Sequence, residues 1–272
     1  MLYNAKNGNI KIGNTDMDYI TFGKGSRNLI MIPGLGDGLK TVRGAALPVA
    51  AMYKCFASRY KVYVFSRKNH LEKGYSTREM AADYKTVMDK LGVAKADVIG
   101  ISQGGMIAQY IAIDFPELVE KLVLAVTLSR QNETVQKVIG SWLKMAVESD
   151  YKSIFIDTTE KSYTEKRLKK YRPFYPLLVK FGKPKNFSRF IIQANACITH
   201  DAYDELEKIK CPTLIIGVDN DKVAGVNSSE EMAAKIENSK LIIYDGYGHG
   251  VYEEAKDFNS KVLEFLSFSH TN

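Results

Sequence analysis

The stretch that decides the fold reads Asp97-Val98-Ile99-Gly100-Ile101-Ser102-Gln103-Gly104-Gly105-Met106-Ile107-Ala108. Its first half predicts a buried strand over residues 96–101, and its second half begins the apolar spacing of a helix over 103–114. Ser102 stands at the bend, in the pattern G-x-S-x-G. We expect Gly100 and Gly104 to remove Cβ atoms that would collide in so sharp a turn. A hydroxyl at a helix N-terminus is well placed for chemistry that develops negative charge, so Ser102 is a candidate nucleophile.

The pattern also has a plainer interpretation. In a chain with 20 glycines among 272 residues, G-x-S-x-G arises by chance in roughly one chain in ten. A serine at such a turn can act only as a helix cap. The strand before Ser102 and the amphipathic helix after it favour the nucleophile.

The composition is that of a globular protein, because 45% of the 272 residues are hydrophobic and a chain of this length can bury a full core. No run of 18 apolar residues occurs, and the N-terminal sequence is too polar for a signal peptide. We therefore expect a cytoplasmic protein without a membrane span. The three cysteines, Cys55, Cys197 and Cys211, are widely spaced and are expected to be reduced and structural.

The net charge of +7 comes from one segment. Residues 151–190 contain eleven Lys or Arg and three acids (Asp157, Glu160 and Glu165), a balance of 11 − 3 = +8, so the rest of the chain carries about −1. Such a local concentration argues against a general nucleic-acid-binding surface, and we expect no nucleic-acid partner.

Strands and helices alternate along most of the chain. Strands are predicted at 9–13, 16–22, 29–32, 61–65, 121–126, 211–217 and 240–244, and helices at 48–59, 77–91 (capped by Thr77), 228–237 and 254–268. Repeated strand–helix–strand units predict an α/β fold with a mostly parallel central sheet and helices on both faces. The loops at 33–38 and 66–76 and Ser102 each follow a strand, so they should share the carboxyl edge of the sheet, where such folds bind ligands.

The alternation stops between residues 128 and 204. This segment is aromatic, basic and helical in its pattern, and no buried strand can be recognised in it. We predict a core domain formed by residues 1–127 and 205–272, with a helical lid at 128–204 inserted into it.

A serine nucleophile needs a base that takes its proton and a third group that orients the base. Of the four histidines, His249 follows the last predicted strand in a glycine-rich loop, and we choose it as the base. His200 lies at the end of the predicted lid and His270 in the C-terminal tail. His70 lies in the loop 66–76, where we interpret it as a solvated side chain.

Two aspartates, Asp219 and Asp221, follow the strand at 211–217 and compete for the third position. We favour Asp221 and keep Asp219 as the alternative, because Asp219 comes only two residues after Gly217.

The glycine-dense loop at 33–38 follows a buried strand, so its backbone can approach a ligand closely. We assign the backbone N–H groups of Leu35 and Gln103 to an oxyanion hole, the alternative being that the loop is an ordinary turn. Neither G-x-G-x-x-G nor G-x-x-x-x-G-K-[ST] occurs, and the cysteines lack metal-ligand spacing. We expect no cofactor and no metal.

Together these motifs resemble the α/β-hydrolase superfamily, in its lidded, esterase-like branch. The motifs are Pro33-Gly34-Leu35-Gly36, Gly100-Ile101-Ser102-Gln103-Gly104-Gly105, Asp221-Lys222-Val223 and Gly246-Tyr247-Gly248-His249. The chain order Ser102, Asp221, His249 is also that of the superfamily. The resemblance covers residues 9–127 and 210–268 and implies hydrolysis through an acyl-enzyme. Dehalogenase and epoxide-hydrolase chemistry is disfavoured, because serine stands at the bend in place of aspartate.

The sequence departs from the superfamily pattern in three places. Pro33 stands where many members have histidine before the oxyanion glycine, and residues 66–70 replace an acidic, glycine-rich loop. One extra residue between Gly217 and Asp221 keeps Asp219 open as the acid.

Small-molecule esters are the substrates that the resemblance implies first, as for a carboxylesterase. Thioesters, lactones and carbon–carbon bonds beside a ketone remain open, because fold analogy does not choose among them. A second class is a ligand-binding protein that keeps the fold without turnover, which would not be modified at Ser102 by a fluorophosphonate. The sequence does not indicate an oligomeric state.

The basic segment also carries nine aromatic side chains, namely Tyr151, Phe155, Tyr163, Tyr171, Phe174, Tyr175, Phe181, Phe187 and Phe190. In one interpretation the cations are solvated and the aromatics pack the lid onto the sheet. In the other, this face turns toward the pocket mouth, where aromatics hold an apolar or aryl group and cations attract an anionic one. Arg67 and Lys68 would then add to the same field.

Overall fold

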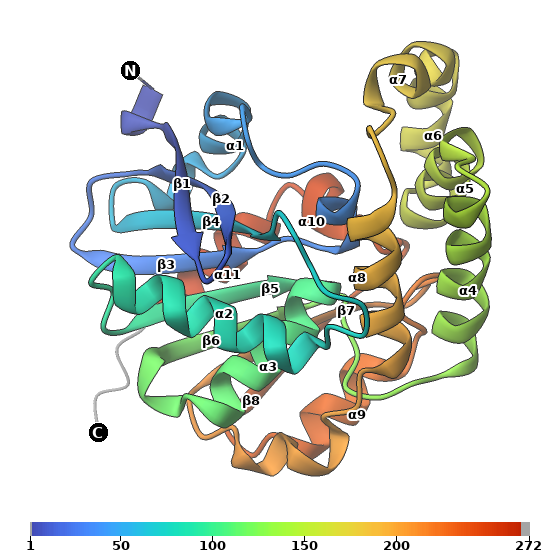
Figure 1. Cartoon of the computed structure of the whole chain (residues 1–272). Coiled ribbons are helices and arrows are strands. Elements are labelled where there is room, and N and C mark those ends of the chain that lie inside the picture. Colours follow the sequence, from blue (N-terminus) through green and yellow to red (C-terminus); the bar gives the residue numbers. More distant parts are fainter. Residues whose placement is uncertain (1, 268–272) are drawn as a thin grey trace.

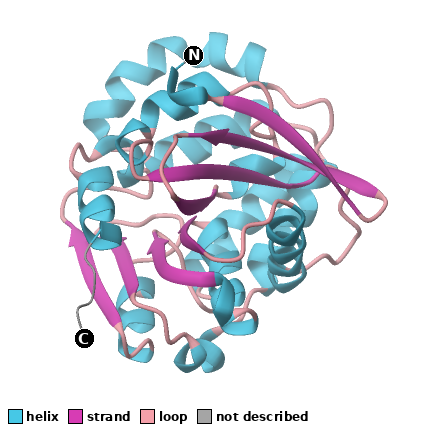
Figure 2. Cartoon of the chain, turned by 90° about the vertical axis from the view of Figure 1, so that its left-hand side faces the viewer, coloured by secondary structure: helices cyan, strands magenta, loops and turns pink. Residues whose placement is uncertain are grey.

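A computed structural model describes residues 2–267 of the chain. Its strands are β1 (Lys6–Ile12), β2 (Thr15–Phe22), β3 (Arg27–Ile32), β4 (Tyr60–Lys68), β5 (Ala96–Ile101), β6 (Val119–Ala125), β7 (Thr213–Val218) and β8 (Ser239–Tyr244). They form one sheet (Figures 1 and 2). The order of its strands is β1-β2-β4-β3-β5-β6-β7-β8. The pairs β1–β2 and β2–β4 are antiparallel and all the others are parallel. The predicted α/β fold with a mostly parallel sheet is confirmed.

Helices connect the parallel strands and lie on both faces of the sheet (Figure 1). The α-helices are α1 (Ala46–Met52), α2 (Thr77–Lys90), α3 (Gln103–Asp114), α4 (Glu133–Val147), α5 (Tyr151–Ser162), α6 (Glu165–Tyr171), α7 (Tyr175–Gly182), α8 (Ser188–Thr199), α9 (Ser228–Lys235), α10 (Val251–Glu254) and α11 (Phe258–Ser267). Short 3₁₀ turns are η1 (Leu2–Asn4), η2 (Leu35–Gly38), η3 (Lys54–Phe56), η4 (Pro116–Leu118), η5 (Arg172–Phe174) and η6 (Tyr203–Lys208). No helix within residues 2–267 combines the length and apolarity needed to cross a membrane.

The central strands are buried on both faces, which explains their continuous apolar runs. In β3, Ile30 and Ile32 belong to the apolar cluster under α2, α3 and α9, whereas Leu29 and Met31 belong to the cluster under α1 and α11. This alternation holds two helical layers on one sheet. Because β3, β5, β6 and β7 run parallel, their carboxyl ends meet at one edge of the sheet.

The bend after β5 depends on very close backbone approaches. A Cβ atom on Gly100 would lie 2.5 Å from the backbone oxygen of Gly104, which confirms the expected collision inside the turn. Gly104 is needed for a different reason than we predicted. Its Cβ would lie 2.0 Å from the backbone oxygen of Ile32, so this glycine lets α3 touch the end of β3.

Several predicted element ends were wrong. The strand predicted at 61–65 continues to Lys68, because Arg67 is buried and paired in spite of its charge. The helix predicted at 48–59 ends at Met52 and gives way to η3, which turns Phe56 into the core.

Two helix termini also differ from the prediction. The cap of α2 is Ser76, whose Oγ accepts from the N–H of Glu79 while the Glu79 carboxylate accepts from the N–H of Ser76. The helix predicted at 254–268 begins only at Phe258, as α11, because Glu254 ends the preceding short helix α10. Val251 of α10 and Phe258 of α11 reach the same apolar cluster, and residue 268 lies outside the described residues.

Helices α4 to α8 follow β6 and precede β7, and they form the yellow-green to orange part of Figure 1. We call residues 133–199 the helical insertion. Its last helix, α8, returns to the sheet edge, where a Cβ on Gly38 would lie 2.7 Å from the Cα of Phe190. The boundary predicted between residues 204 and 205 falls inside η6, whose Leu206 belongs to the core.

We predict that Gly104→Ala destabilises the protein by about 1–3 kcal/mol, because the new methyl group overlaps the backbone of β3. Gly140→Ala is the matched control, since a Cβ on Gly140 in α4 meets no atom within 4 Å. Alanine there favours the helix by about 1 kcal/mol. Urea unfolding measures both free energies, and equal midpoints for Gly104→Ala and the wild type would contradict the steric argument.

Candidate active site

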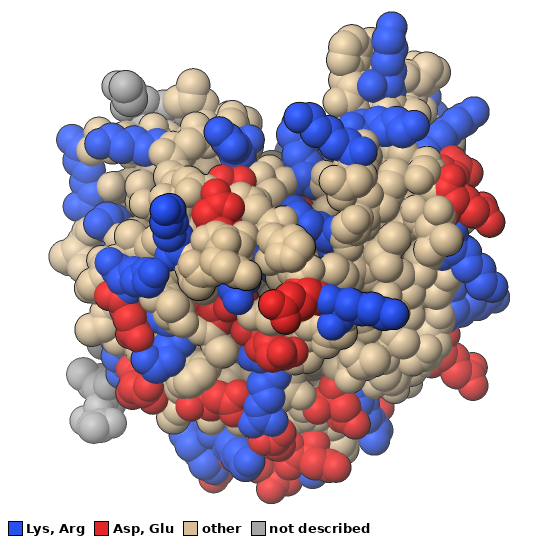
Figure 3. All heavy atoms as spheres, in the orientation of Figure 1, with Lys and Arg blue, Asp and Glu red and all other residues tan. Residues whose placement is uncertain are grey.

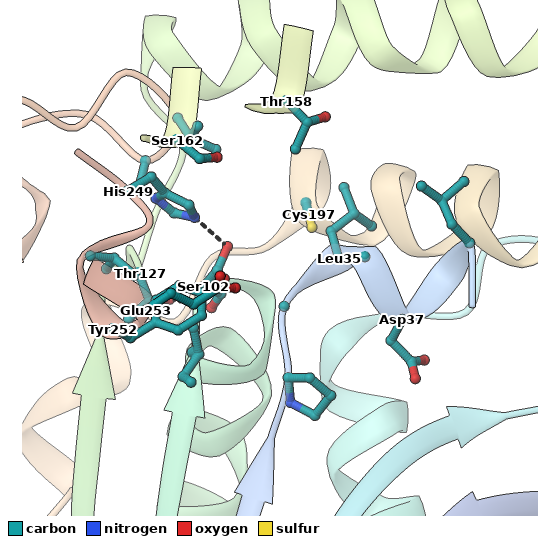
Figure 4. A pocket seen from close by; sticks show the side chains of 18 of the residues that line it. Leu35, Asp37, Ser102, Thr127, Thr158, Ser162, Cys197, His249, Tyr252 and Glu253 are labelled. Carbon is teal, nitrogen blue, oxygen red and sulfur yellow. Dashed lines mark hydrogen bonds between the residues drawn. The ribbon is translucent and has the colours of Figure 1, made fainter. Parts of the chain in front are cut away.

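Ser102 occupies a strained position between β5 and α3, with φ 55° and ψ −121°. Its backbone is fixed on both sides, because its N–H donates to the oxygen of Ala125 at 2.9 Å and its carbonyl accepts from the hydroxyl of Thr127 at 2.7 Å. Figure 4 shows the Ser102 side chain pointing toward His249 from the top of the bend. The fold therefore holds this hydroxyl at the carboxyl edge of the sheet.

The three residues chosen for the triad lie in one hydrogen-bonded chain. Nε2 of His249 lies 3.0 Å from Oγ of Ser102, and Nδ1 of His249 lies 3.0 and 2.9 Å from the two carboxylate oxygens of Asp221. The His249 and Asp221 side chains are 9% and 4% exposed. This geometry lets Asp221 orient the ring and leaves Nε2 directed at the serine.

The two aspartates after β7 have different environments. Oδ1 of Asp221 also accepts from the N–H groups of Val223 and Ala224, each at 2.8 Å, so this buried carboxylate is held rigidly. Asp219 is exposed, and its Oδ1 accepts from the N–H of Gly246 at 2.9 Å. The structure thus brings Asp221 to His249, while Asp219 ties its own loop to the loop that carries His249.

The backbone N–H groups chosen for an oxyanion hole belong to the first residues of two helical segments, Leu35 in η2 and Gln103 in α3. At that position an N–H has no acceptor within its own helix. The loop before Leu35 lies against the serine, because a Cβ on Gly34 would be 3.3 Å from the Cβ of Ser102. Both N–H groups are therefore candidates for binding a developing negative charge.

A cavity of about 480 Å³ opens in front of Ser102 and His249. Its wall is mainly apolar and comes from the core, from α1 and from the helical insertion. Members of this wall include Leu35, Leu39, Val49, Met52, Met106, Leu128, Ile139, Trp142, Tyr151, Ile154, Phe155, Tyr163, Phe190 and Tyr252. The volume suits a small molecule with an apolar group.

Polar groups on the cavity wall are few. Thr158 and Ser162 of α5 lie across the cavity from Ser102 (Figure 4). Asp37 and Glu253 are the acidic residues of the wall, and no Lys or Arg of the described chain lines it. The cations of the segment 151–190 therefore lie outside the cavity wall. Four of the nine aromatics predicted for this segment do line it, namely Tyr151, Phe155, Tyr163 and Phe190.

Residues 27–256 match the sequence family described as the alpha/beta hydrolase fold. The chain belongs to this family. The resemblance to the α/β-hydrolase superfamily is therefore confirmed.

Several curated relatives of this α/β hydrolase carry hydrolase names, and others are named putative non-heme bromoperoxidase. A putative carbamate hydrolase, RutD, of Caulobacter sp. (strain K31) is 25% identical over 89% of this chain and 91% of its own. A 2-hydroxy-6-oxononadienedioate/2-hydroxy-6-oxononatrienedioate hydrolase of Klebsiella pneumoniae is 30% identical over 67% of this chain and 66% of its own.

Solved structures show the same fold. MGS-M2, an alpha/beta hydrolase from a Medee basin deep-sea metagenome library, superposes with a TM-score of 0.86 at 20% identity, over 97% of this chain and 99% of that one. The enol-lactonase of Burkholderia xenovorans LB400 superposes with a TM-score of 0.82 at 18% identity, over 96% of this chain and 100% of that one.

A buried ionic network supports the loop of Leu35 in this α/β hydrolase. Oδ2 of Asp37 accepts from Nη2 of Arg189 at 2.8 Å and from the N–H of Arg67 at 3.1 Å. The Arg67 guanidinium donates to the oxygen of Pro33 at 2.6 Å, and its Nη1 lies 3.9 Å from Oδ2 of Asp37. The network therefore clamps the loop of Leu35 between β4 and α8.

The sequence predicted Arg67 and Lys68 in a loop, where they would add to the field of the basic segment if they faced the pocket mouth, and the structure corrects this. Arg67 is 1% exposed within β4, and Nζ of Lys68 pairs with Asp83 at 2.6 Å. Arg189 was missed as a supporting residue, because nothing in the sequence distinguishes it from the other cations of its segment. Gln103 adds a second tie to α8, since its side chain donates to the backbone oxygen of Gln193 at 2.7 Å.

The other candidate bases and nucleophiles are the three remaining histidines and the three cysteines. Burial lowers the pKa of His200 to about 3, and its Nδ1 pairs with the hydroxyl of Thr77 at 2.9 Å. Cys197 lines the cavity, but burial raises the pKa of its thiol to about 12, so it stays protonated near neutral pH. Cys55, Cys197 and Cys211 are all free thiols. His70 is exposed, and His270 lies outside the described residues.

We predict that Asp221→Asn lowers kcat/KM by a large factor, on the order of the 10⁴ found for serine-protease triads, because an amide cannot hold the productive tautomer of His249. Asp219→Asn is the matched control, since an amide oxygen can still accept from the N–H of Gly246. Steady-state hydrolysis of a p-nitrophenyl ester measures kcat/KM for both variants. A larger loss in Asp219→Asn would reverse the assignment.

Proposed function

We propose that this protein is a serine hydrolase that cleaves small-molecule esters through an acyl-enzyme. The observation that carries the proposal is the chain of hydrogen bonds from Asp221 through His249 to Ser102, next to an apolar cavity. Unlike a residue that only caps a helix, Ser102 makes no side-chain capping bond to α3.

In the proposed reaction, Oγ of Ser102 attacks the ester carbonyl while Nε2 of His249 takes its proton. Asp221 stabilises the imidazolium that forms, and the N–H groups of Leu35 and Gln103 bind the oxyanion. His249 then returns the proton to the leaving alcohol, which departs and leaves an acyl group on Ser102. Water, deprotonated by the same histidine, releases the acid and restores the serine.

We propose that the helical insertion serves as the lid of this site, since α5 and α8 supply Tyr151, Phe155 and Phe190 to the cavity wall. These aromatics would hold the apolar part of the substrate and exclude water from the acyl-enzyme. Thr158 and Ser162 are polar groups placed to select substrates within that wall.

We predict that Ser102→Ala and His249→Ala each lower turnover of p-nitrophenyl esters by at least about 10³-fold, because the nucleophile or its base is lost. A fluorophosphonate should label the wild type at one site, as read by intact mass, and should leave Ser102→Ala unlabelled. An unlabelled wild type would favour the ligand-binding alternative. Near-normal turnover in either variant would exclude the triad.

A neutral substrate suits the cavity better than the anionic one considered from the sequence. The wall has no described Lys or Arg, and its two acids, Asp37 and Glu253, are already paired with Arg189 and Arg167 outside it. A carboxylate bound there would lose its water without gaining a cation. The relatives named for a dioate thus give no direct guide to this substrate, although carbon–carbon, lactone and thioester cleavage would use the same triad.

We predict that kcat/KM for a neutral ester exceeds that for its carboxylate-bearing isostere at both about 0.01 M and about 0.1 M salt, where the Debye length falls from about 30 to about 10 Å. Matched pairs of p-nitrophenyl esters measure this ratio, and Ser102→Ala gives the background. An advantage of the carboxylate at low salt that shrinks as salt rises would instead support attraction by the basic segment.

A further inference from the structure

Four large apolar side chains are exposed together at the far end of the helical insertion. We call residues 174–181 the α7 tip. Its exposed members are Phe174 (56%), Leu177 (55%), Leu178 (41%) and Phe181 (74%). A group of this kind on one short helix marks a contact surface more often than chance exposure does.

The α7 tip is firmly attached to the rest of the insertion. Tyr175 is buried, its ring lies 5.5 Å from that of Phe155, and its hydroxyl donates to Glu160 at 2.9 Å. A Cβ on Gly182 would lie 2.3 Å from the hydroxyl of Tyr151, so the end of α7 is also in contact. One side of the helix is therefore fixed, and the apolar side chains face outward.

Exposed lysines surround the tip. Residues 166–200 contain nine Lys or Arg and no Asp or Glu. Arg167, Arg172 and Arg189 are paired with acids. The exposed lysines Lys169, Lys170, Lys180, Lys183 and Lys185 form no ion pair within residues 2–267. Figure 3 shows basic side chains gathered around the projection at the upper right, away from most of the acidic groups.

We propose that the α7 tip docks this protein on the surface of an anionic lipid bilayer. The apolar side chains would enter the interface while the lysine ammonium groups, on long stems, reach the anionic headgroups. The shape favours a bilayer over a protein partner, because the tip projects from the molecule (Figures 1 and 3). The composition favours it too, since lysine is depleted in protein–protein interfaces.

The proposed orientation brings the cavity toward the bilayer. Met52, at the end of α1, lines the cavity and is 49% exposed, and Leu47 on the same helix is 56% exposed. Figure 1 shows α1 and α7 rising on the same side of the molecule, with an interval between them. A bilayer that contacts the tip would therefore face Met52 as well.

Vesicle co-sedimentation tests the proposal without any turnover. The full chain should bind vesicles of phosphatidylcholine with phosphatidylserine and should not bind vesicles of phosphatidylcholine alone. Binding should weaken as salt rises, because the lysines act through charge. Equal binding to both vesicles, or binding to neither, would overturn the proposal.

Two double variants separate the apolar and the charged contributions. Leu177→Ser with Phe181→Ser should weaken binding to anionic vesicles by about tenfold or more, because the inserted apolar surface is lost. Lys183→Gln with Lys185→Gln should weaken it by about 25-fold, at about fivefold for each lysine.

Each double variant has a matched control on another surface. Val147→Ser removes an apolar side chain that is 71% exposed on α4, and Lys11→Gln with Lys240→Gln makes the same change in net charge. Both controls should bind like the wild type, and equal losses in tip and control variants would overturn the proposal. All replaced side chains are exposed, so circular dichroism should show unchanged folding.

Sedimentation velocity tests whether the tip instead binds a second copy of this chain. The wild type would then be a dimer, and Leu177→Ser with Phe181→Ser would convert it to monomers. That result would overturn the proposal of membrane docking.

Discussion

The positive φ angle of Ser102 is the constraint on which the rest of the site depends. A non-glycine residue in that region is strained by about 1–3 kcal/mol, so the surrounding structure must hold it there. The structure does so with a backbone hydrogen bond to Ala125 of β6, with a hydrogen bond from the Thr127 hydroxyl and with glycine contacts that admit almost no additional atom. These contacts bring the ends of β3, β5 and β6 together, and the loops that carry Leu35 and Thr127 then fall beside the serine. Position, more than residue type, distinguishes Ser102 from the other serines of the chain.

The core of the fold could be predicted from the sequence because its signals are local. Continuous apolar runs between glycine-rich loops marked the buried strands, and α3 begins and ends where its pattern predicted. The prediction failed where tertiary contacts override polarity. Ser66, Arg67 and Lys68 look like a solvated loop, yet they extend β4, because Arg67 finds Asp37 and the oxygen of Pro33 inside the protein.

The candidate site also has a part that could be predicted from the sequence and a part that depends on tertiary contacts. Ser102, Asp221 and His249 could be chosen because each follows a strand, and parallel strands bring such positions to one edge. The support from Arg189 could not be anticipated, since it joins residues 152 positions apart through a helix of the insertion. Nor could the sequence separate the cations that pair with acids from the lysines around α7. That distinction depends on which side of each helix meets the protein.

The ties between α8 and the loop of Leu35 have an evolutionary consequence. Helical insertions of this kind can be regarded as exchangeable modules that change substrate range while the core supplies the chemistry. Here the exchange is restricted, because Arg189 of the insertion makes the 2.8 Å ion pair with the buried Asp37 of the core, whose other cationic partner, Arg67, lies 3.9 Å away. Removing one partner from a buried ion pair is costly. A foreign segment grafted between β6 and β7 would have to bring its own cation to that position, so the history of the insertion and that of the loop of Leu35 are linked.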